Sequence, residues 1–139
     1  YAYDKNAGVP ERARLETNII FPHVSASVLQ RGDMVKINRE QVKAGTIVGF
    51  FLIARGWENG YINYEKPTYY TDYHFNKDGL QQHILFKEGQ CGDIVMAFED
   101  KALNNGSDYD FNDVIFTIAD NDQQRETQAF NLQGIVQYE

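Results

Sequence analysis

The feature that most constrains the fold of this chain is a series of short apolar runs, rich in β-branched and aromatic residues and separated by turn-forming residues. No segment carries the sustained i, i+3, i+4, i+7 spacing of an amphipathic helix. Short runs bounded by Gly, Pro, Asn and Asp are typical of strands. We therefore predict an all-β fold, an antiparallel β-sandwich similar to a jelly roll. The predicted strands lie within residues 13–22, 32–38, 45–57, 82–89, 92–100, 113–120 and 129–139.

The length of 139 residues corresponds to a single domain that can bury a core of its own. Residues 1–12 are polar and contain Pro10 and Gly8, so we predict a loosely held lead-in segment followed by one domain at residues 13–139. Because the chain begins with Tyr1 rather than Met, we expect it to be a module of a larger protein.

Charge and cysteine content exclude several classes of function. The net charge of −7 argues against a nucleic-acid partner, whose phosphates require a basic surface. No run approaches the roughly 18 apolar residues of a membrane-spanning helix, so we expect no membrane insertion by this chain. A single cysteine, Cys91, excludes an internal disulfide and a thiolate zinc cluster. We find no G-x-S-x-G, H-E-x-x-H or Cys/His arrangement and expect no enzyme activity.

A dense group of oxygen-bearing side chains lies between the strands predicted at residues 92–100 and 113–120. If these strands pair as an antiparallel hairpin, its closure brings the two ends of the group to one edge of the sheet. Ca²⁺ takes six to eight oxygen ligands at about 2.3–2.6 Å, from carboxylates and carbonyls. The sequence therefore predicts a calcium site. Its candidate ligands are Glu99, Asp100, Asp108, Asp110, Asn112 and Asp113.

An EF-hand, a site for a different metal and a solvated loop are the alternatives to this calcium site. An EF-hand requires Gly at loop position 6 and Glu at position 12, where this chain has Asp113 and Ala119. The absence of His and Cys from the group disfavours zinc and copper, and Mg²⁺ rarely takes a cage made only of protein ligands. The remaining alternative is a solvated acidic loop whose Asp and Asn side chains form Asx turns.

Four stretches of the sequence, in this order, resemble the DUF4114 family, including the related C-terminal domains of LruC-type bacterial surface proteins. They are "GTIVGFFLIARGWENG", "YYTDYHFN", "QQHILF" and residues 98–118, and the resemblance covers about residues 44–119. It implies a secreted or cell-surface β-sandwich module of bacterial proteins that binds calcium through the acidic motif. Glu99 and Asp100 match the Phe-Glu-Asp part of that motif, and residues 108–113 match its second part. Ala97 departs from the Gly that is common before Phe-Glu-Asp.

Two further groups have both a functional and a structural interpretation. Asp72, Asn76, Asp78 and His83 form a second metal site or support the first, and the alternative is a hydrogen-bonded turn with a structural histidine. Trp57 and Tyr61, in an aromatic-rich region at residues 57–73, are the candidates for stacking on a sugar ring, and the alternative is packing on the sheet.

We therefore expect a calcium-stabilised structural or adhesion module of an extracellular or cell-surface bacterial protein. The alternative function is a calcium-dependent carbohydrate-binding module that uses the loop aromatics. The expected partners are calcium and either a glycan or another surface protein.

Overall fold

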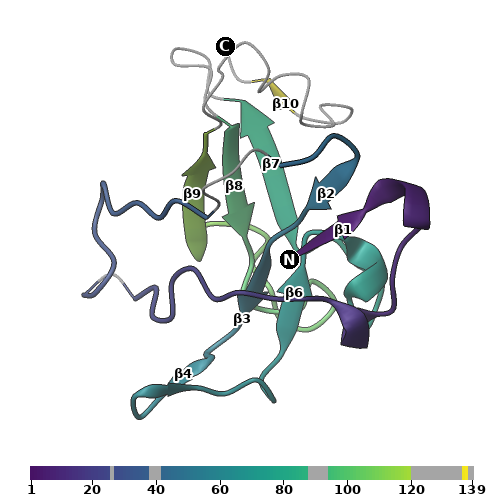
Figure 1. The fold of residues 1–139 in the computed structure, drawn as a ribbon. Coiled ribbons are helices and arrows are strands. Elements are labelled where there is room, and N and C mark those ends of the chain that lie inside the picture. The colour runs from purple at the N-terminus through teal and green to yellow at the C-terminus, as the bar shows by residue number, and fades with distance from the viewer. Residues whose placement is uncertain (26, 38–41, 88–93, 120–135, 138–139) are drawn as a thin grey trace. The chain divides into compact units, whose positions relative to one another are not determined.

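A computed structural model describes residues 1–25, 27–37, 42–87, 94–119 and 136–137. The predicted all-β class is confirmed, because the described residues form strands in small, mainly antiparallel sheets, with three short 3₁₀ helices (Figure 1). The strands are β1 (Ala2–Asp4), β2 (Thr46–Val48), β3 (Phe51–Ile53), β4 (Trp57–Glu58), β5 (Tyr61–Ile62), β6 (Thr68–Tyr70), β7 (His83–Lys87), β8 (Ile94–Phe98), β9 (Val114–Ile118) and β10 (Val136–Gln137). The 3₁₀ helices are η1 (Lys5–Ala7), η2 (Arg12–Arg14) and η3 (Tyr73–Phe75). The described part of the chain contains no helix with the length and apolar character of a membrane span.

The contacts of the chain fall into two compact units, unit 1 at Tyr1–Gly79 and unit 2 at Leu80–Glu139. The described residues of unit 1 form three two-stranded antiparallel ladders, which pair β1 with β2, β3 with β6, and β4 with β5. The aromatic rings of Tyr1, Tyr3 and Tyr70 each pack edge-on against Phe75, with centroid distances of 5.7, 6.2 and 5.7 Å. Unit 1 is therefore organised around an aromatic cluster.

The first residues of the chain are part of unit 1, which corrects the prediction of a loosely held lead-in segment. β1 pairs with β2 in the register Tyr3↔Ile47. The ring of Tyr1 lies so close to Gly49 that a Cβ atom at this position would clash with it. Gly49 also divides the predicted strand at residues 45–57, because β2 on one side pairs with β1 and β3 on the other side pairs with β6.

Two predicted strands of unit 1 are not formed. Residues 13–22 contain the end of η2 followed by irregular chain, and the described residues of 32–38 contain no strand. In the second segment Met34 is 88% exposed and Ile37 is 54% exposed. Alternating apolar residues form a strand only when a neighbouring strand accepts the backbone hydrogen bonds, and none does so here among the described residues.

In unit 2 the residues that the structure describes form one four-stranded sheet in the order β10-β7-β8-β9. β7 pairs with β8, and β8 with β9, in antiparallel ladders, whereas β10 is parallel to β7. Every residue of β8 is buried, so both faces of this strand are covered. The β8–β9 hairpin predicted from the sequence is confirmed. The connection at residues 88–93, with Cys91, and most of the strand predicted at residues 129–139 lie outside the described residues.

Candidate metal centre

The acidic loop, which we define as Glu99–Asp113, connects the end of β8 to the start of β9. The register Phe98↔Val114 makes Glu99 and Asp113 the next opposed pair beyond the ladder. The backbone N–H of Asp100 donates a hydrogen bond to Asp113 Oδ2 at 2.7 Å. Hairpin closure therefore brings the two ends of the acidic loop together, in agreement with the prediction from the sequence.

The carboxylates of the acidic loop form two sets that share one member. Oxygens of Glu99, Asp108 and Asp110 all lie within 4.8 Å of one another, and so do oxygens of Glu99, Asp100 and Asp113. None of these five groups forms a salt bridge with a described residue. Like charges at this separation repel each other, and a bound cation would offset the repulsion.

Glu99 is the residue that distinguishes this loop from an ordinary acidic surface loop. Its side chain is only 1% exposed, and Oε2 has no hydrogen-bond partner among the described residues. Oε1 accepts only a long contact of 3.4 Å from the backbone N–H of Lys101. A buried carboxylate is costly unless it is paired or coordinates a metal. The donor set therefore fits a hard cation with oxygen ligands, and Ca²⁺ fits better than Zn²⁺ because no nitrogen or sulfur ligand belongs to either set.

The backbone of the acidic loop is irregular and does not follow a strand between Asp108 and Asn112. Tyr109 and Phe111 have positive φ angles of 62° and 50°. Asp110 Oδ1 accepts a hydrogen bond from the backbone N–H of Asn112, and Asp110 Oδ2 accepts one from Asn112 Nδ2. A solvated Asx turn would contain the same bonds. These contacts are therefore compatible with a calcium site and with a solvated loop, and the burial of Glu99 is what favours a cation.

Gln82 holds the acidic loop and was missed by sequence reasoning. It is fully buried, at 0% exposure, and its carbonyl extends the β7–β8 ladder by accepting the backbone N–H of Glu99 at 3.0 Å. Its side-chain Nε2 donates to the carbonyl of Lys101 at 2.7 Å, and its Oε1 accepts the N–H of Leu103 at 2.9 Å. The available signal was its position as the first residue of the strand predicted at residues 82–89.

The sequence matches a family of domains of unknown function, DUF4114, over residues 42–121, which is more than half of the chain. The chain belongs to the DUF4114 family. The match includes the strands of both units from β2 to β9 and the whole acidic loop. No curated protein and no solved structure matches the chain.

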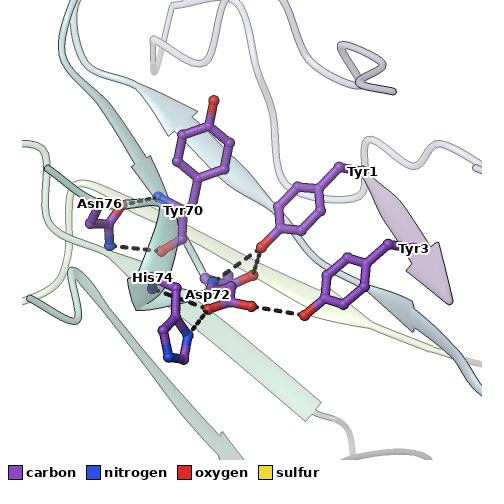
Figure 2. Close-up of polar contacts among 7 residues, drawn as sticks. Tyr1, Tyr3, Tyr70, Asp72, His74 and Asn76 are labelled. Carbon is purple, nitrogen blue, oxygen red and sulfur yellow. Dashed lines mark hydrogen bonds and ion pairs between the residues drawn. The ribbon is translucent and has the colours of Figure 1, made fainter. Parts of the chain in front are cut away.

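The second predicted group of ligands in this DUF4114 chain is divided between the two units, with Asp72, Asn76 and Asp78 in unit 1 and His83 in unit 2. Asp72, Asp78 and His83 take part in neither carboxylate set. Instead, Asp72 Oδ2 accepts the hydroxyl of Tyr3 at 2.8 Å and Oδ1 contacts His74 Nδ1 at 2.7 Å (Figure 2). Burial acts to raise the pKa of the Asp72 carboxyl, but hydrogen bonds from His74 and Tyr3 outweigh it and hold that pKa below its usual value. Burial and the bond to Asp72 raise the pKa of Tyr3 to about 12.

Asn76 is a backbone clamp in unit 1 of this DUF4114 chain. Its Oδ1 accepts the backbone N–H of Tyr70 at 2.7 Å, and its Nδ2 donates to the carbonyl of Tyr70 at 3.0 Å (Figure 2). The side chain is buried, with 6% exposure. Both of its polar atoms are thus used in holding β6 against the turn that follows it.

His83 lies at the start of β7 with its ring against Phe98, at a centroid distance of 5.8 Å. It is 9% exposed, and its Nδ1 has no hydrogen-bond partner among the described residues. Burial lowers the pKa of His83 to about 4. The structure therefore places it as a neutral core residue beside the strand that leads into the acidic loop.

Trp57 and Tyr61 occupy the β4–β5 hairpin, in unit 1 of the DUF4114 chain. Trp57 is opposite Ile62 and Tyr61 is opposite Glu58, so the two aromatic side chains project from opposite faces of the ladder. The ring of His23 stacks on Trp57 at a centroid distance of 5.3 Å and an angle of 13°. Trp57 and Tyr61 therefore do not form one flat platform, and each is a separate candidate for contact with a ligand.

Proposed function

We propose that this chain is a calcium-binding module in which the cation orders the acidic loop and stabilises the β8–β9 hairpin. The observation that carries the proposal is the buried Oε2 of Glu99, which has no described partner and belongs to a group of carboxylates with no described salt bridge. The role is structural rather than catalytic. Binding to the folded state alone stabilises that state by mass action.

The expected calcium affinity of the site indicates in which compartment the module works. Most of the carboxylates are exposed, and calcium sites of extracellular modules have dissociation constants of about 10⁻⁴–10⁻³ M. Such a site fills where calcium is about millimolar, as outside cells, and not at the far lower cytosolic level. We therefore propose a structural or adhesion module within a larger secreted or cell-surface bacterial protein.

Thermal unfolding in EDTA, in a Ca²⁺ titration and in Mg²⁺ tests this function. Calcium at about 100 times its dissociation constant adds roughly 2.7 kcal/mol to the free energy of unfolding. For a domain of this size the midpoint then rises by about 10 °C. We expect no comparable rise with Mg²⁺, because Mg²⁺ gives up its waters reluctantly.

Two variants make the unfolding test specific. Asp110→Asn removes a charge from one carboxylate set and should reduce the calcium response. Glu65→Gln is the matched control, because Glu65 is exposed, lies in unit 1 and forms no described salt bridge. Superimposed curves for the unmodified chain in EDTA and in calcium contradict the proposal.

A calcium-dependent carbohydrate-binding module is the second candidate. It is favoured by the exposure of Trp57, Tyr61 and Tyr64, which are 38%, 55% and 65% exposed. Because Trp57 and Tyr61 project from opposite faces of the hairpin, we expect a sugar to contact one of them only. Glycan binding that needs calcium and is lost in Trp57→Ala, but retained in Tyr61→Ala, supports this candidate, and the absence of any reproducible glycan contradicts it.

A further inference from the structure

Glu99 belongs to both carboxylate sets of the acidic loop, whereas the other four carboxylates divide into two pairs. Asp108 and Asp110 complete one set, and Asp100 and Asp113 complete the other. An ion held by one set leaves the other pair without a counter-charge. We propose that the acidic loop binds two calcium ions, which share the Glu99 carboxylate as a bridging ligand. This inference rests on the proposed function and extends it from a calcium site to a binuclear one.

The charge of the loop favours two ions over one. The two sets contain five different carboxylates, with a charge of −5 when all are ionised. One Ca²⁺ leaves −3, and two leave −1. No described salt bridge supplies the difference. Two divalent ions that share ligands lie about 3.5–4 Å apart, and a carboxylate between them with a further pair on each side offsets their repulsion.

Glu99 has the properties that a bridging ligand requires. Its Oε2 has no described partner, and its Oε1 makes only the 3.4 Å contact with the backbone N–H of Lys101. Both oxygens are therefore available to a cation. Because the side chain is 1% exposed, its position is fixed by packing, and the acids of the two pairs, which are more exposed, complete each set from the solvent side.

One outer carboxylate in each set is oriented by hydrogen bonds that leave it able to coordinate a cation. The N–H of Asp100 holds Asp113 Oδ2, and Asn112 holds both oxygens of Asp110. An ionised carboxylate has about four lone-pair sites, so each of these groups still has acceptor capacity for a cation. The bonds lie in different sets, and each set is therefore positioned by its own local contact.

The number of calcium ions per chain tests this inference. Isothermal titration calorimetry and equilibrium dialysis on the full chain should give two ions for the unmodified protein. Asp110→Asn and Asp113→Asn should each retain one ion, since each substitution weakens one set. Glu99→Gln should bind neither, and Glu65→Gln should bind two. Circular dichroism in EDTA shows whether each variant is folded.

The outcomes separate this inference from the proposed function. One ion in the unmodified chain overturns the binuclear site and leaves the calcium-binding function standing. No bound ion overturns both. Two ions that disappear together in Asp110→Asn, or that persist in Asp113→Asn, contradict the division into two sets. If a variant does not fold, the ion count of the unmodified chain decides.

Discussion

The two units contain similar polar residues but satisfy them differently. In unit 1 the carboxylate of Asp72 and the amide of Asn76 both find hydrogen-bond partners within the unit. In unit 2, Glu99 Oε2 and His83 Nδ1 are the two buried side-chain atoms without a partner among the described residues. Asp72 and Asn76, whose polar atoms are paired, have a structural role, and His83 is a neutral core residue, whereas the open carboxylate oxygen of Glu99 is a candidate for binding a cation.

Each unit contains a buried side-chain amide that holds a segment of backbone. Asn76 bonds the N–H and carbonyl of Tyr70, six residues away in the sequence. Gln82 bonds the carbonyl of Lys101 and the N–H of Leu103, which are 19 and 21 residues away. Both clamps fix a backbone segment, but only the segment held by Gln82 carries an unpaired carboxylate. The clamp alone therefore does not indicate a metal site.

The largest expected effect comes from Asn76→Ala. The substitution leaves two backbone groups of Tyr70 without their partners, and each such group costs about 1–3 kcal/mol. We expect the free energy of unfolding, measured with urea, to fall by about 3–4 kcal/mol, allowing for partial access of water. The loss should be the same in EDTA and in calcium. Asn18→Ala, at an exposed position, is the control and should change little. A loss that depends on calcium would contradict the separation of the two roles.

Gln82→Met should have a smaller effect that does depend on calcium. Methionine keeps the approximate size of the side chain but removes both bonds to the acidic loop. We expect a loss of about 2–3 kcal/mol in EDTA, with calcium affinity also weakened, because the ion must then order a looser loop. Gln81→Met is the control, since Gln81 is exposed and makes one hydrogen bond with the carbonyl of His83. If Gln82→Met leaves the calcium affinity unchanged, Gln82 stabilises the fold but does not contribute to calcium binding.

The sequence predicts the hairpin and the acidic loop but not the two amide clamps. The β8–β9 hairpin and the acidic loop were predictable because two apolar runs flank the acidic residues directly. The clamp of Gln82 was not, because its bonds cross about 20 positions of the sequence and depend on the β7–β8 register. In the sequence Asn76 is indistinguishable from an ordinary turn residue, because its role depends on hydrogen bonds with the backbone of Tyr70 in β6. No strand forms in the described part of the predicted range 32–38, because alternation of apolar and polar side chains does not by itself supply a pairing partner.

Two of the three histidines, one in each unit, differ in their burial and therefore in their effect on the pH dependence of stability. His74 is half exposed and contacts Asp72, whereas His83 is buried and its pKa is lowered to about 4. From the usual value of about 6.5 down to pH 4, the unfolded chain takes up a proton at His83 and the folded chain does not. The folded state therefore loses stability as the pH falls through this window. Between pH 7 and pH 5, where most carboxylates stay ionised, we expect a loss of about 2 kcal/mol.

Urea unfolding in EDTA at pH 7, 6 and 5 measures the contribution of His83. The variant His83→Phe, which replaces the imidazole beside Phe98 with a phenyl ring that cannot take up a proton, should show a flatter pH profile in this range. His74→Phe is the control, because His74 is half exposed, and this variant should keep the fall in stability between pH 7 and pH 5. A profile for His83→Phe as steep as that of the unmodified chain would assign the pH dependence to other groups.

The smallest expected effect comes from Glu99→Gln, and it tests whether the role of this carboxylate differs from that of Asp72 in unit 1. In EDTA the folded chain keeps the buried Glu99 side chain without a described partner for Oε2, and Glu99→Gln replaces the carboxyl group with a neutral amide that costs less to bury. We expect the variant to be more stable than the unmodified chain in EDTA, by about 1–2 kcal/mol. In saturating calcium the order should reverse, because only the unmodified chain gains the binding energy. If Glu99 had only a structural role, Glu99→Gln would be less stable than the unmodified chain in both EDTA and calcium, because the substitution would break a favourable contact. Thermal unfolding of both proteins, in EDTA and in calcium, therefore distinguishes a carboxylate held for a cation from one that serves the fold, as Asp72 does in unit 1.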